Sequence, residues 1–476
     1  MEATQRSQPP HNIALLPPPS FLGHLIPFIE LAKKLVFHHN CTITLILPDD
    51  GSSMKPQKSL LQGLPTSIYT VFLPPVSTND LPENARAELL VSVRLTRSFP
   101  AVRDTLTSLK QSGTPAAALV VDLFAIDAID IAKQFGIPAY LFHVIATYEL
   151  SLSVLLPNLD ESCTSEYSDM AEPITLPGSI VLTPEDLPES LKQRNSEVHK
   201  WALDWCNKFL EADGVMVNSF LELEIEAFKD LEQRCPGVPP VYPVGPLIRT
   251  GTEAESDRGA ECVKWLNDQP PKSVLFVSFG SGGTLSVKQF NELASGLEMS
   301  GHRFLWVVRS PQENAADAYL NSQSIAKDPL DSLPEGFLER TKERGLVVAS
   351  WAPQIQVLSH RATGGFLTHC GWNSILESTV FGVPLIAWPL CFEHKMNAVF
   401  LTDGLKGAIR VKENENGVVG REQISELVRR LMEGEEGNQI RNRMSDVKIA
   451  AGKCFEREGS SSKALAHVVE QWINWK

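Results

Sequence analysis

The sequence predicts an α/β protein made of two Rossmann-like, doubly wound domains. The chain has 476 residues, of which 43% are hydrophobic, which is too long for one ordinary domain and apolar enough for two cores. Strand–helix–strand patterns begin twice, at Ile13 and at Val274. Between them, residues 239–247 are rich in Pro and Gly, as is typical of a linker. We therefore predict domains at 1–248 and 249–458.

The first domain opens with an apolar strand at 13–16, a helix over 25–36 with apolar residues at helical spacing, and a strand at 42–47. This βαβ unit should have a right-handed crossover. His24 lies where the strand meets the helix, so we expect its side chain at the carboxyl edge of the sheet, where ligands bind. The same position also suits an ordinary helix-start histidine bonded to nearby backbone.

An aspartate lies inside the next apolar run. Residues 81–110 form a mostly helical segment, and 118–124 read as a strand that contains Asp122. A buried carboxylate needs a partner, and His24 is the candidate. A carboxylate bound to one imidazole nitrogen fixes the tautomer, so that the other nitrogen can accept a proton. The alternative is an aspartate held by backbone N–H groups at a strand end.

The second domain begins with a glycine-rich turn after its first strand. We expect the strand at 215–218 to be the last of the first domain and the strand at 274–278 to open the second. The turn at 279–284 could touch a diphosphate through Ser281 and the N–H of Gly282. It matches neither a P-loop nor a dinucleotide fingerprint.

The remaining elements of this domain are assigned by simpler signals. Ser286 and Gln289 have capping-box spacing and should open a helix. Residues 309–335 read as a surface loop, and residues 439–455 read as a helix. A break at 459–462 then precedes a final helix.

The stretch from Trp351 to His394 is the most informative part of the chain. A buried strand at 364–368 and a helix from Asn373 enclose the turn 369–372. Such a strand-to-helix turn leaves backbone N–H groups free to bind an anion. We expect a phosphate there, with Ser374 and His369 adding polar groups.

Residues around that turn suit the rest of a nucleotide. Trp351 ends an apolar run and could stack on a base, while Gln354 could reach ribose or base. Glu377 lies one helical turn after the start of its helix and could accept hydrogen bonds from ribose hydroxyls. Glu393 and His394 follow another strand, at 384–388, and should also lie at a carboxyl end.

With these residues in place, the stretch resembles the signature box of the plant family-1 UDP-sugar glycosyltransferases. Five further segments resemble the subgroup of the hydroquinone glucosyltransferase type, which glucosylates simple phenols: VVDLF at 120–124, YPVGPLI at 242–248, SFGSGGTLS at 278–286, GFLERTKERG at 336–345 and KMNAV at 395–399. The similarity spans nearly the whole chain.

The resemblance implies a GT-B fold, in which two Rossmann-like domains face each other across a cleft and the last helix, about 459–476, packs back on the first domain. It implies that His24, in the G-H-x-x-P stretch at 23–27, is the catalytic base, assisted by Asp122. The residues it implies for UDP-sugar binding are Ser281, Gly282, Trp351, Ala352, Gln354, His369, Trp372, Asn373, Ser374, Glu377, Glu393, His394 and Thr147. Those implied for acceptor binding are Glu88, Phe124 and His143, although Glu88 could equally be a solvated helix-face carboxylate.

Three positions depart from the family pattern. The loop 18–22 has one extra residue, and Ala146 stands near the place where the family commonly has a sugar-contacting threonine, leaving Thr147 one place along. His394 ends the box where glucose-using members have Gln, a variation associated in the family with galactose-using enzymes.

The expected reaction is transfer of glucose from UDP-glucose to a phenolic or related hydroxyl with inversion. His24 takes the proton as the hydroxyl attacks, and UDP leaves. Hydroquinone, lignin-type alcohols, indoxyl and chlorophenols all remain open as acceptors. The alternatives are a UDP-galactose-dependent transferase, a catalytically impaired UDP-sugar-binding protein, or a nucleotide-sugar epimerase.

The composition of the chain limits the kinds of ligand and partner that we expect. A net charge of −14 argues against nucleic acid. The eight cysteines contain no C-x-x-C pair, and no D-x-D pair suggests a divalent cation, so we expect no disulfides, no metal and no cofactor besides the donor substrate. No apolar stretch reaches membrane-spanning length, and the polar N-terminus does not resemble a signal peptide. We expect a cytosolic monomer.

Overall fold

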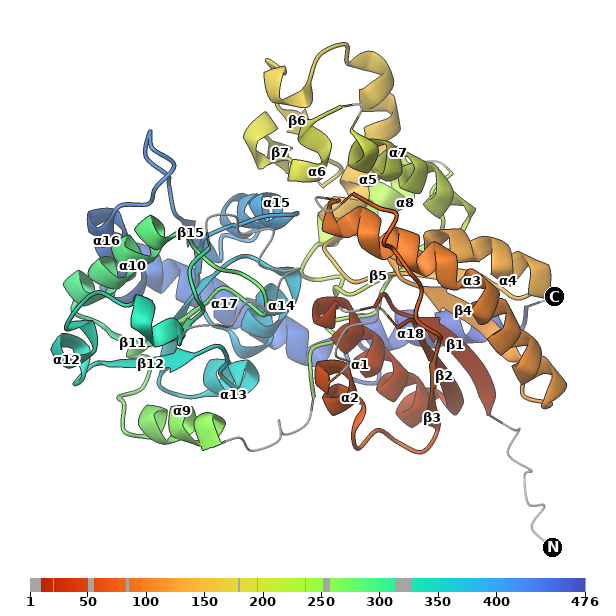
Figure 1. The fold of residues 1–476 in the computed structure, drawn as a ribbon, viewed down its shortest axis with the longest axis horizontal. Coiled ribbons are helices and arrows are strands. Elements are labelled where there is room, and N and C mark those ends of the chain that lie inside the picture. The colour runs from red at the N-terminus through yellow and green to blue at the C-terminus, as the bar shows by residue number, and fades with distance from the viewer. Residues whose placement is uncertain are drawn as a thin grey trace, which may run out of the picture. The chain divides into compact units, whose positions relative to one another are not determined.

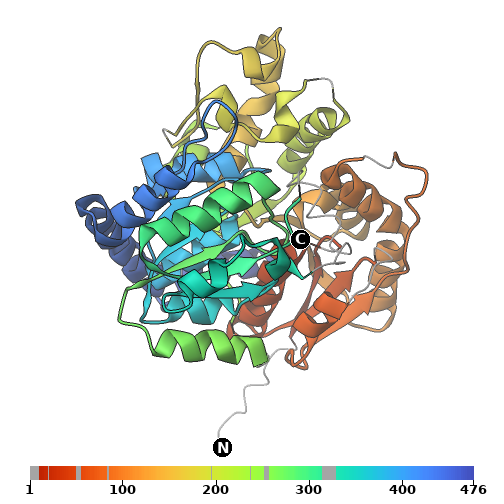
Figure 2. The same cartoon turned by 60° about the vertical axis from the view of Figure 1, so that its left-hand side comes forward.

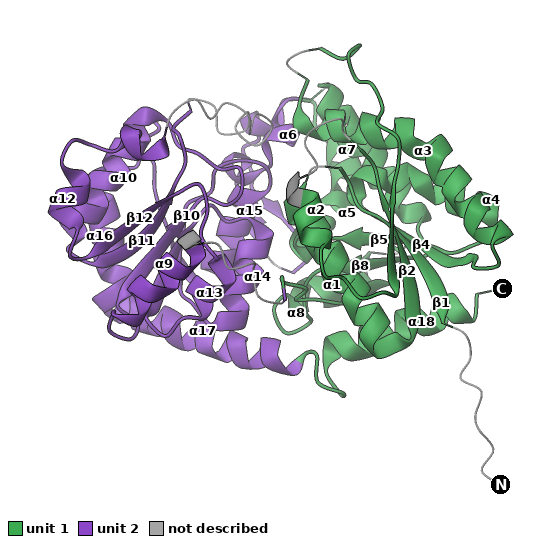
Figure 3. Cartoon of the chain, turned by 60° about the horizontal axis from the view of Figure 1, so that its bottom comes forward, with its two compact units in different colours: residues 1–164, 194–249, 454–476 green, residues 165–193, 250–453 purple. Residues whose placement is uncertain are grey.

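The structure is a computed structural model that describes residues 10–19, 21–49, 55–82, 85–178, 180–194, 196–235, 237–250, 257–312 and 328–475. The chain divides into two compact units (Figure 3). Unit 1 comprises residues 1–164, 194–249 and 454–476, and unit 2 comprises residues 165–193 and 250–453. Each unit is an α/β structure with its own parallel sheet, as the sequence predicts.

The sheet of unit 1 has the strand order β3-β2-β1-β4-β5-β8-β9 (Figure 1). All its pairings are parallel, and the central strands are almost wholly buried, as is typical of a sheet covered on both faces. The strands are β1 (His11–Leu16), β2 (Cys41–Leu47), β3 (Ile68–Phe72), β4 (Ala116–Val121), β5 (Ala139–His143), β8 (Gly214–Val217) and β9 (Val241–Pro243).

Two helices far apart in sequence share one face of this sheet. Leu31 of the first helix and Val468 of the last belong to the same buried apolar cluster as the strand residues Leu15 and Phe142. The helices of unit 1 are α1 (Leu22–His39), α2 (Lys55–Leu61), α3 (Ala87–Gln111), α4 (Ile129–Phe135), α5 (Thr147–Ser162), α7 (Glu197–Lys208), α8 (Ile225–Arg234) and α18 (Ser460–Ile473). Helices α1 and α18 therefore cover the face opposite to α3, α4 and α7 (Figure 1).

The predicted βαβ start is confirmed, but three details of unit 1 were predicted wrongly. Strand β4 ends at Val121, and Asp122 is the N-cap of a 3₁₀ turn, η1 (Leu123–Ala128), because its side chain accepts the Phe124 N–H. β8 is not the last strand, since β9 pairs beside it. The serine run predicted as a break instead opens α18, with Gly459 as N-cap.

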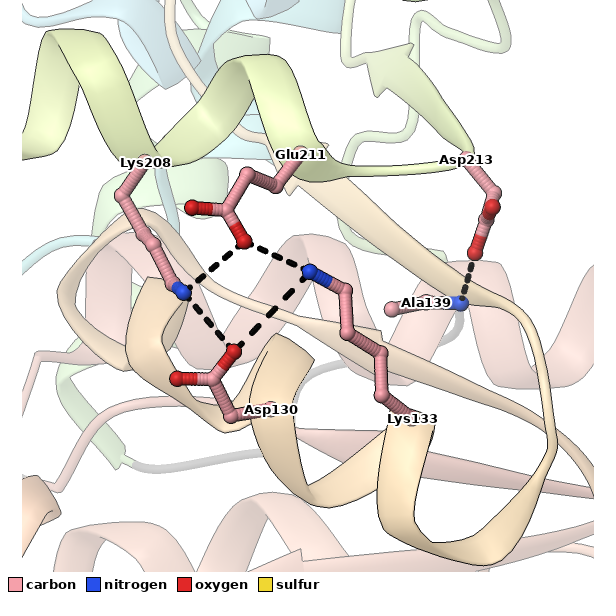
Figure 4. Close-up of polar contacts among 6 residues, drawn as sticks. All are labelled: Asp130, Lys133, Ala139, Lys208, Glu211 and Asp213. Atoms are coloured by element: carbon pink, nitrogen blue, oxygen red, sulfur yellow. Dashed lines mark hydrogen bonds and ion pairs between the residues drawn. The ribbon is translucent and has the colours of Figure 1, made fainter.

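Charged side chains join the start of α4 to the end of α7 (Figure 4). Lys133 Nζ lies 2.5 Å from Glu211 Oε2, and Lys208 Nζ lies 2.8 Å from Asp130 Oδ1 and 3.0 Å from Glu211 Oε2. These hydrogen bonds lower the pKa of Glu211. Exposed pairs contribute little singly, but this closed network links two helices that flank the site described below.

The sheet of unit 2 has the order β12-β11-β10-β13-β14-β15, again all parallel (Figures 1 and 2). The strands are β10 (Val274–Ser278), β11 (Arg303–Val308), β12 (Gly345–Ala349), β13 (Thr363–Thr368), β14 (Leu385–Ala387) and β15 (Ala408–Arg410). The strands predicted at 274–278, 364–368 and 384–388 are thereby confirmed to within one residue at each end.

Helices cover both faces of the second sheet. α10 and α16 pack on each other over one face, while α9, α13 and α14 lie over the other. The helices are α9 (Asp257–Asn267), α10 (Val287–Ser300), α12 (Phe337–Thr341), α13 (Gln354–Ser359), α14 (Trp372–Phe381), α15 (His394–Val399), α16 (Arg421–Glu433) and α17 (Glu435–Lys453). Residues 165–193 add the hairpin β6 (Ile174–Thr175) and β7 (Val181–Leu182), the turns η2 (Tyr167–Asp169) and η3 (Pro184–Asp186), and α6 (Glu189–Lys192).

The capping box predicted for α10 is only half present. Ser286 accepts the Gln289 N–H at 3.2 Å, as predicted. The Gln289 side chain does not return to Ser286, because it binds both backbone groups of Val419 inside the unit. Most of the loop predicted at 309–335 lies outside the described residues. In the part of the chain that the structure describes, no helix is long and apolar enough to cross a membrane.

Candidate active site

Each sheet has one point where the chain order of its strands reverses direction. In unit 1 this switch point lies between β1 and β4, and in unit 2 it lies between β10 and β13. The loops that leave such a pair of strands diverge to opposite faces and open a crevice at the carboxyl edge, where doubly wound folds bind ligands. The predicted site residues gather at these two edges, and each edge is described separately.

At the edge of unit 1, His24 and Asp122 come together. His24 follows β1 and lies in the first turn of α1, and Asp122 follows β4 directly. His24 Nδ1 lies 2.8 Å from Asp122 Oδ2, while Asp122 Oδ1 accepts the Phe124 N–H at 3.0 Å. The Asp122 side chain is 0% exposed and that of His24 is 15% exposed. Both expected roles of Asp122, histidine partner and strand-end cap, are therefore present in one carboxylate.

This geometry defines the tautomer of His24. An ionised carboxylate only accepts hydrogen bonds, so Nδ1 carries the proton and donates it to Asp122. Nε2 is then the basic nitrogen, and no hydrogen bond reaches it from any described residue. The pair can accept a proton at Nε2 and stabilise the resulting imidazolium.

Aromatic rings surround the histidine. The centroid of the His24 ring lies 5.7 Å from Phe21 and 5.5 Å from Phe124, and Phe124 stacks on Trp201 of α7 at 5.6 Å. The Trp201 Nε1 donates to Ser92 Oγ on α3. Flat, apolar side chains around a base suit a flat aromatic guest. Phe21 and Trp201 were not predicted, because nothing in their local sequence marks them.

The other residues expected in unit 1 are less accessible. Glu88 is half-buried in the first turn of α3. His143 is 0% exposed, with Nε2 3.0 Å from Glu149 Oε2 at an angle unsuited to a hydrogen bond. The Thr147 hydroxyl is buried and donates to Glu224 Oε2 at 2.9 Å, so it is committed inside the unit.

At the edge of unit 2, the His369 ring is enclosed by two glycines. A Cβ on Gly280, after β10, would lie 2.6 Å from the His369 ring, and a Cβ on Gly371 would lie 2.4 Å from Nε2. Gly280 also has a φ of +77°. Burial lowers the pKa of His369 to about 4, so the ring is neutral at physiological pH. Gly280 was missed from sequence, although a glycine after a strand is the signal of such close approach.

The start of α14 presents the expected polar groups. Its N-cap is Gly371, so the first N–H groups of the helix can be offered to an anion. Gln354 Nε2 donates to Ser374 Oγ at 2.9 Å and to Glu377 Oε2 at 2.6 Å, which joins three predicted ligands into one network. Trp372 packs its buried indole near Phe400, at 5.9 Å.

The other predicted donor-site residues lie in the loops beside this network. Trp351, which is 38% exposed, and Ser281 are open to solvent. Asn373 and Gly282 are half-buried, and Ala352 is buried. These side chains and backbone groups all follow β10, β12 or β13, as the sequence predicts. The carboxyl edge of unit 2 therefore carries an indole, backbone N–H groups and hydroxyls along one line of loops.

The backbone at this edge is strained at three non-glycine residues. Ser350, Cys370 and Phe392 have φ values of +70°, +68° and +53°. Each lies beside a predicted ligand residue: Trp351, His369 and Glu393 respectively. Left-handed conformations at such residues persist only where the surroundings hold them, and they concentrate at functional sites.

Asn397 is one of the groups that hold this backbone. Its buried side chain donates to the Cys370 carbonyl at 2.9 Å and lies 3.4 Å from Glu393 Oε1. The residue was not singled out from sequence, because its role depends on a contact 27 positions away. His394, at the start of α15, accepts the Cys391 N–H on Nδ1 at 3.3 Å and meets the His369 ring edge to face at 4.9 Å.

Metal ligands are not grouped at either edge. Among the described residues, no set of three His, Cys, Asp or Glu side chains could hold a metal ion. All eight cysteines are free thiols.

Known proteins are similar to this chain in both fold and sequence. Residues 240–439 match the model of the family described as "UDP-glucoronosyl and UDP-glucosyl transferase". A hydroquinone glucosyltransferase of Rauvolfia serpentina is 51% identical over 465 residues, covering 98% of each chain.

Two solved structures are similar over nearly the whole chain. A UDP-glucosyltransferase of Polygonum tinctorium that glucosylates indoxyl, in complex with 3,4-dichloroaniline, gives a TM-score of 0.91 at 45% identity, covering 98% of this chain and 100% of that one. A Phytolacca americana glycosyltransferase bound to UDP-2-fluoro-glucose and pterostilbene gives 0.90 at 44% identity, with the same coverage. The predicted GT-B fold class is thereby confirmed. With the motifs at both sheet edges and this identity over the full length, the chain belongs to the UDP-glucosyltransferase family.

Proposed function

We propose that the protein transfers glucose from UDP-glucose to the hydroxyl of a small phenol, with inversion at the anomeric carbon. The observation that carries this proposal is the His24–Asp122 pair at the switch point of unit 1, with 2.8 Å between Nδ1 and Oδ2. The acceptor hydroxyl gives its proton to His24 Nε2 while its oxygen attacks the anomeric carbon. The bond from that carbon to the diphosphate oxygen breaks, and UDP leaves. A single displacement of this kind inverts the configuration.

The edge of unit 2 supports the proposed leaving group. UDP gains negative charge as it departs, and preorganised donors in a fixed position stabilise such charge. The N–H groups at the start of α14 and the side chains of Ser374 and Ser281 are those donors. The Gln354–Glu377 pair and Trp351 would hold ribose and base.

The wall of unit 1 supports an aromatic acceptor. Phe21, Phe124 and Trp201 offer apolar faces next to the base, and Glu88 offers a half-buried carboxylate. A phenol has a pKa near 10, so one general base suffices to assist its attack. The named ligands and substrates of the similar proteins are also aromatic: hydroquinone, indoxyl, pterostilbene and a dichloroaniline.

The test is incubation of the protein with UDP-glucose and hydroquinone, followed by mass spectrometry and proton NMR of the product. We expect UDP and a β-glucoside, whose anomeric coupling reports inversion from the α-linked donor. Binding of UDP-glucose without transfer would favour the catalytically impaired binding protein. Conversion of the sugar nucleotide to an isomer would favour the epimerase.

We also propose that no divalent cation takes part, since helix dipole and hydroxyl groups already face the predicted diphosphate. Activity should survive EDTA. Loss of activity on chelation that Mg²⁺ restores would refute this.

UDP-galactose is a second candidate donor, favoured by one observation. In the family that the sequence resembles, glucose-using members have Gln at the position of His394. The Nδ1 of His394 already accepts a hydrogen bond from the Cys391 N–H. The ring therefore offers the sugar a single N–H donor.

A further inference from the structure

Residues 165–193 form a segment that we call the strap. The chain leaves unit 1 after Thr164, builds the strap within unit 2, and re-enters unit 1 at Arg194. The strap is therefore part of the predicted donor unit, although it lies between two stretches of the predicted acceptor unit in sequence.

The strap has too little structure to be stable alone. In its described residues, 165–178 and 180–193, the only sheet is the two-stranded hairpin of β6 and β7, and an isolated hairpin is marginal in water. Seven of its apolar side chains are nevertheless buried: Tyr167, Ile174, Leu176, Ile180, Leu182, Leu187 and Leu191. The strap must therefore be held by its packing on the rest of unit 2.

That packing is on α15 and the segment after it. Both β7 and η3 contact α15. The Ile180 side chain lies against Gly404, where a Cβ would come within 2.8 Å of Ile180 Cδ1. The glycine thus leaves space for an apolar contact from the strap.

An ion pair fixes the strap at the end of β15. Arg410 Nη2 lies 2.9 Å from Asp186 Oδ1, and the Asp186 side chain is only 10% exposed. The other oxygen, Oδ2, accepts from the Thr183 hydroxyl at 2.6 Å and the Thr183 N–H at 3.2 Å. Oδ1 of Asp186 therefore pairs with Arg410, while its Oδ2 stabilises the turn that begins at Thr183. A weaker pair, Lys395 with Glu189 at 3.7 Å, adds a second point of contact.

The base of the strap is fixed within unit 1. The Arg194 guanidinium donates to the Asp160 side chain and carbonyl, each at 2.8 Å, and to the Cys163 carbonyl. These acceptors lie at the end of α5, where the chain leaves unit 1. The points of exit and re-entry are therefore held together, so the strap is a closed loop rather than a slack connection.

We propose that the strap is a positioning element for the sugar end of the donor site, and that Asp186–Arg410 is its anchoring pair. The helix on which it packs, α15, begins with His394 and has Glu393 as its N-cap. Under the proposed function, on which this inference rests, those two residues address the glucosyl group. Among the described residues, β7 and η3 of the strap pack on α15, whereas neither α13 nor α14, the elements expected to bind UDP itself, has packing of similar extent with the strap. Loosening the strap should weaken binding of the sugar and spare the nucleotide.

The test is calorimetric titration of the full-length protein with UDP-glucose and, separately, with UDP. Arg410→Gln removes the charge and leaves the Thr183–Asp186 turn intact. We expect its Kd for UDP-glucose to rise about three- to tenfold, the range of a partly buried pair, while the Kd for UDP changes less than about twofold. Arg410→Lys, which keeps the charge, should restore most of the difference.

Arg340→Gln is the matched control. It breaks the ion pair with Glu298 at 2.7 Å, which joins α12 to α10 in unit 2 and involves no residue of the strap. Both Kd values should stay at the wild-type level. Ile180→Ala tests the apolar contact independently of charge and should repeat the UDP-glucose effect, which keeps the proposal testable if Arg410→Gln fails to fold.

Equal weakening of UDP and UDP-glucose in Arg410→Gln would overturn the proposal, because it would mean direct diphosphate contact or general loosening of the unit. Unchanged affinity for both ligands in Arg410→Gln and Ile180→Ala would also overturn it. A wild-type protein that binds neither ligand would instead refute the proposed function, so the two failures are distinguishable.

Discussion

The two sheet edges place histidines in opposite environments. At the edge of unit 1, His24 is partly exposed, and its Nδ1 lies 2.8 Å from Oδ2 of the buried carboxylate of Asp122. At the edge of unit 2, His369 is buried between two glycines, no carboxylate among the described residues is hydrogen-bonded to it, and burial lowers its pKa to about 4. The first environment suits proton transfer. The second suits a neutral ring beside a diphosphate.

The edges also differ in what makes them rigid. At unit 2 the backbone itself is held in strained turns, at Ser350, Cys370 and Phe392. At unit 1 the pair is built from side chains 98 positions apart, and aromatic rings from the N-cap of α1, from η1 and from α7 lie around it. Single side-chain changes should therefore cost more catalysis at unit 1, whereas unit 2 should respond through binding and stability.

The largest expected effect is that of His24→Ala. Loss of a general base costs about 10²- to 10⁴-fold in kcat. The Kd for UDP should stay within about twofold, because the base and the predicted nucleotide ligands belong to different units. Initial rates with UDP-glucose and hydroquinone, together with UDP calorimetry, measure both quantities. A variant that keeps more than about a tenth of the wild-type kcat would reject the role of His24.

Asp122→Asn should lower kcat by the same amount as His24→Ala or less, since the carboxylate acts only through the imidazole. An amide can accept a hydrogen bond but carries no charge to stabilise the imidazolium. The double variant should be no slower than His24→Ala alone. Multiplication of the two losses would show that the residues do not act as one unit. Asp130→Asn, in the exposed charge network of Figure 4, is the control and should leave kcat unchanged.

The same contrast explains how much the sequence could predict. The edge of unit 2 is encoded in one contiguous stretch, so its strands and its helix start are predicted correctly from the sequence. The proposed ligand residues lie in the loops of that edge, and their roles stay predictions. His24 and Asp122 were paired by chemistry, because a buried carboxylate needs a partner. What could not be predicted depends on distant contacts: the Phe21 and Trp201 rings, the Asn397 bond to Cys370, and the strap.

The errors share a physical cause. A local sequence pattern predicts a hydrogen bond or an element correctly only where no tertiary contact offers the same residues a more favourable arrangement. Gln289 has capping-box spacing, but the Val419 backbone offers its amide two hydrogen bonds instead of one. The Pro- and Gly-rich segment after β8 reads as a linker, yet Val241 to Pro243 pair beside β8 as an edge strand, where proline is tolerated.

Acid should destabilise unit 2 through its buried histidines. The folded pKa of His369 is about 4 and that of His394 is also lowered by burial, so the unfolded state, with a pKa near 6.5, binds more protons in between. The contribution of neutral His369 is complete above about pH 6.5 and is lost as the pH falls toward 4. Between pH 7.5 and pH 5 it amounts to about 2 kcal/mol in the free energy of unfolding.

Urea unfolding at several pH values measures this effect. His394→Gln should flatten the dependence between pH 7 and pH 5, because it removes one of the two buried imidazoles. His467→Gln, a histidine on α18 of unit 1, serves as the control and should leave the slope unchanged. A wild-type protein with equal stability at pH 7.5 and pH 5 would contradict the neutral, buried state of His369.

The smallest expected effect concerns the donor sugar, which differs between glucose and galactose only in the orientation of the 4-hydroxyl. A glutamine would offer a donor and an acceptor on one planar amide and could hold two adjacent hydroxyls. His394 offers less, because its Nδ1 accepts the Cys391 N–H at 3.3 Å and leaves only the Nε2–H for the sugar. Loss of one hydrogen bond is worth about 0.5–1.5 kcal/mol, or about a three- to twelvefold preference.

That range is too small for one residue to decide the donor alone. We therefore expect the wild-type protein to prefer UDP-glucose and to use UDP-galactose detectably, and His394→Gln to raise the glucose-to-galactose ratio of kcat/KM by up to about twelvefold. The ring also packs edge to face on His369 at 4.9 Å, so a second outcome of His394→Gln is a loosened diphosphate contact at His369. Such a change would lower kcat/KM for both donors equally and leave their ratio unchanged. A wild-type preference for UDP-galactose of more than tenfold would instead show that the single N–H of His394 outweighs every other contact to the sugar.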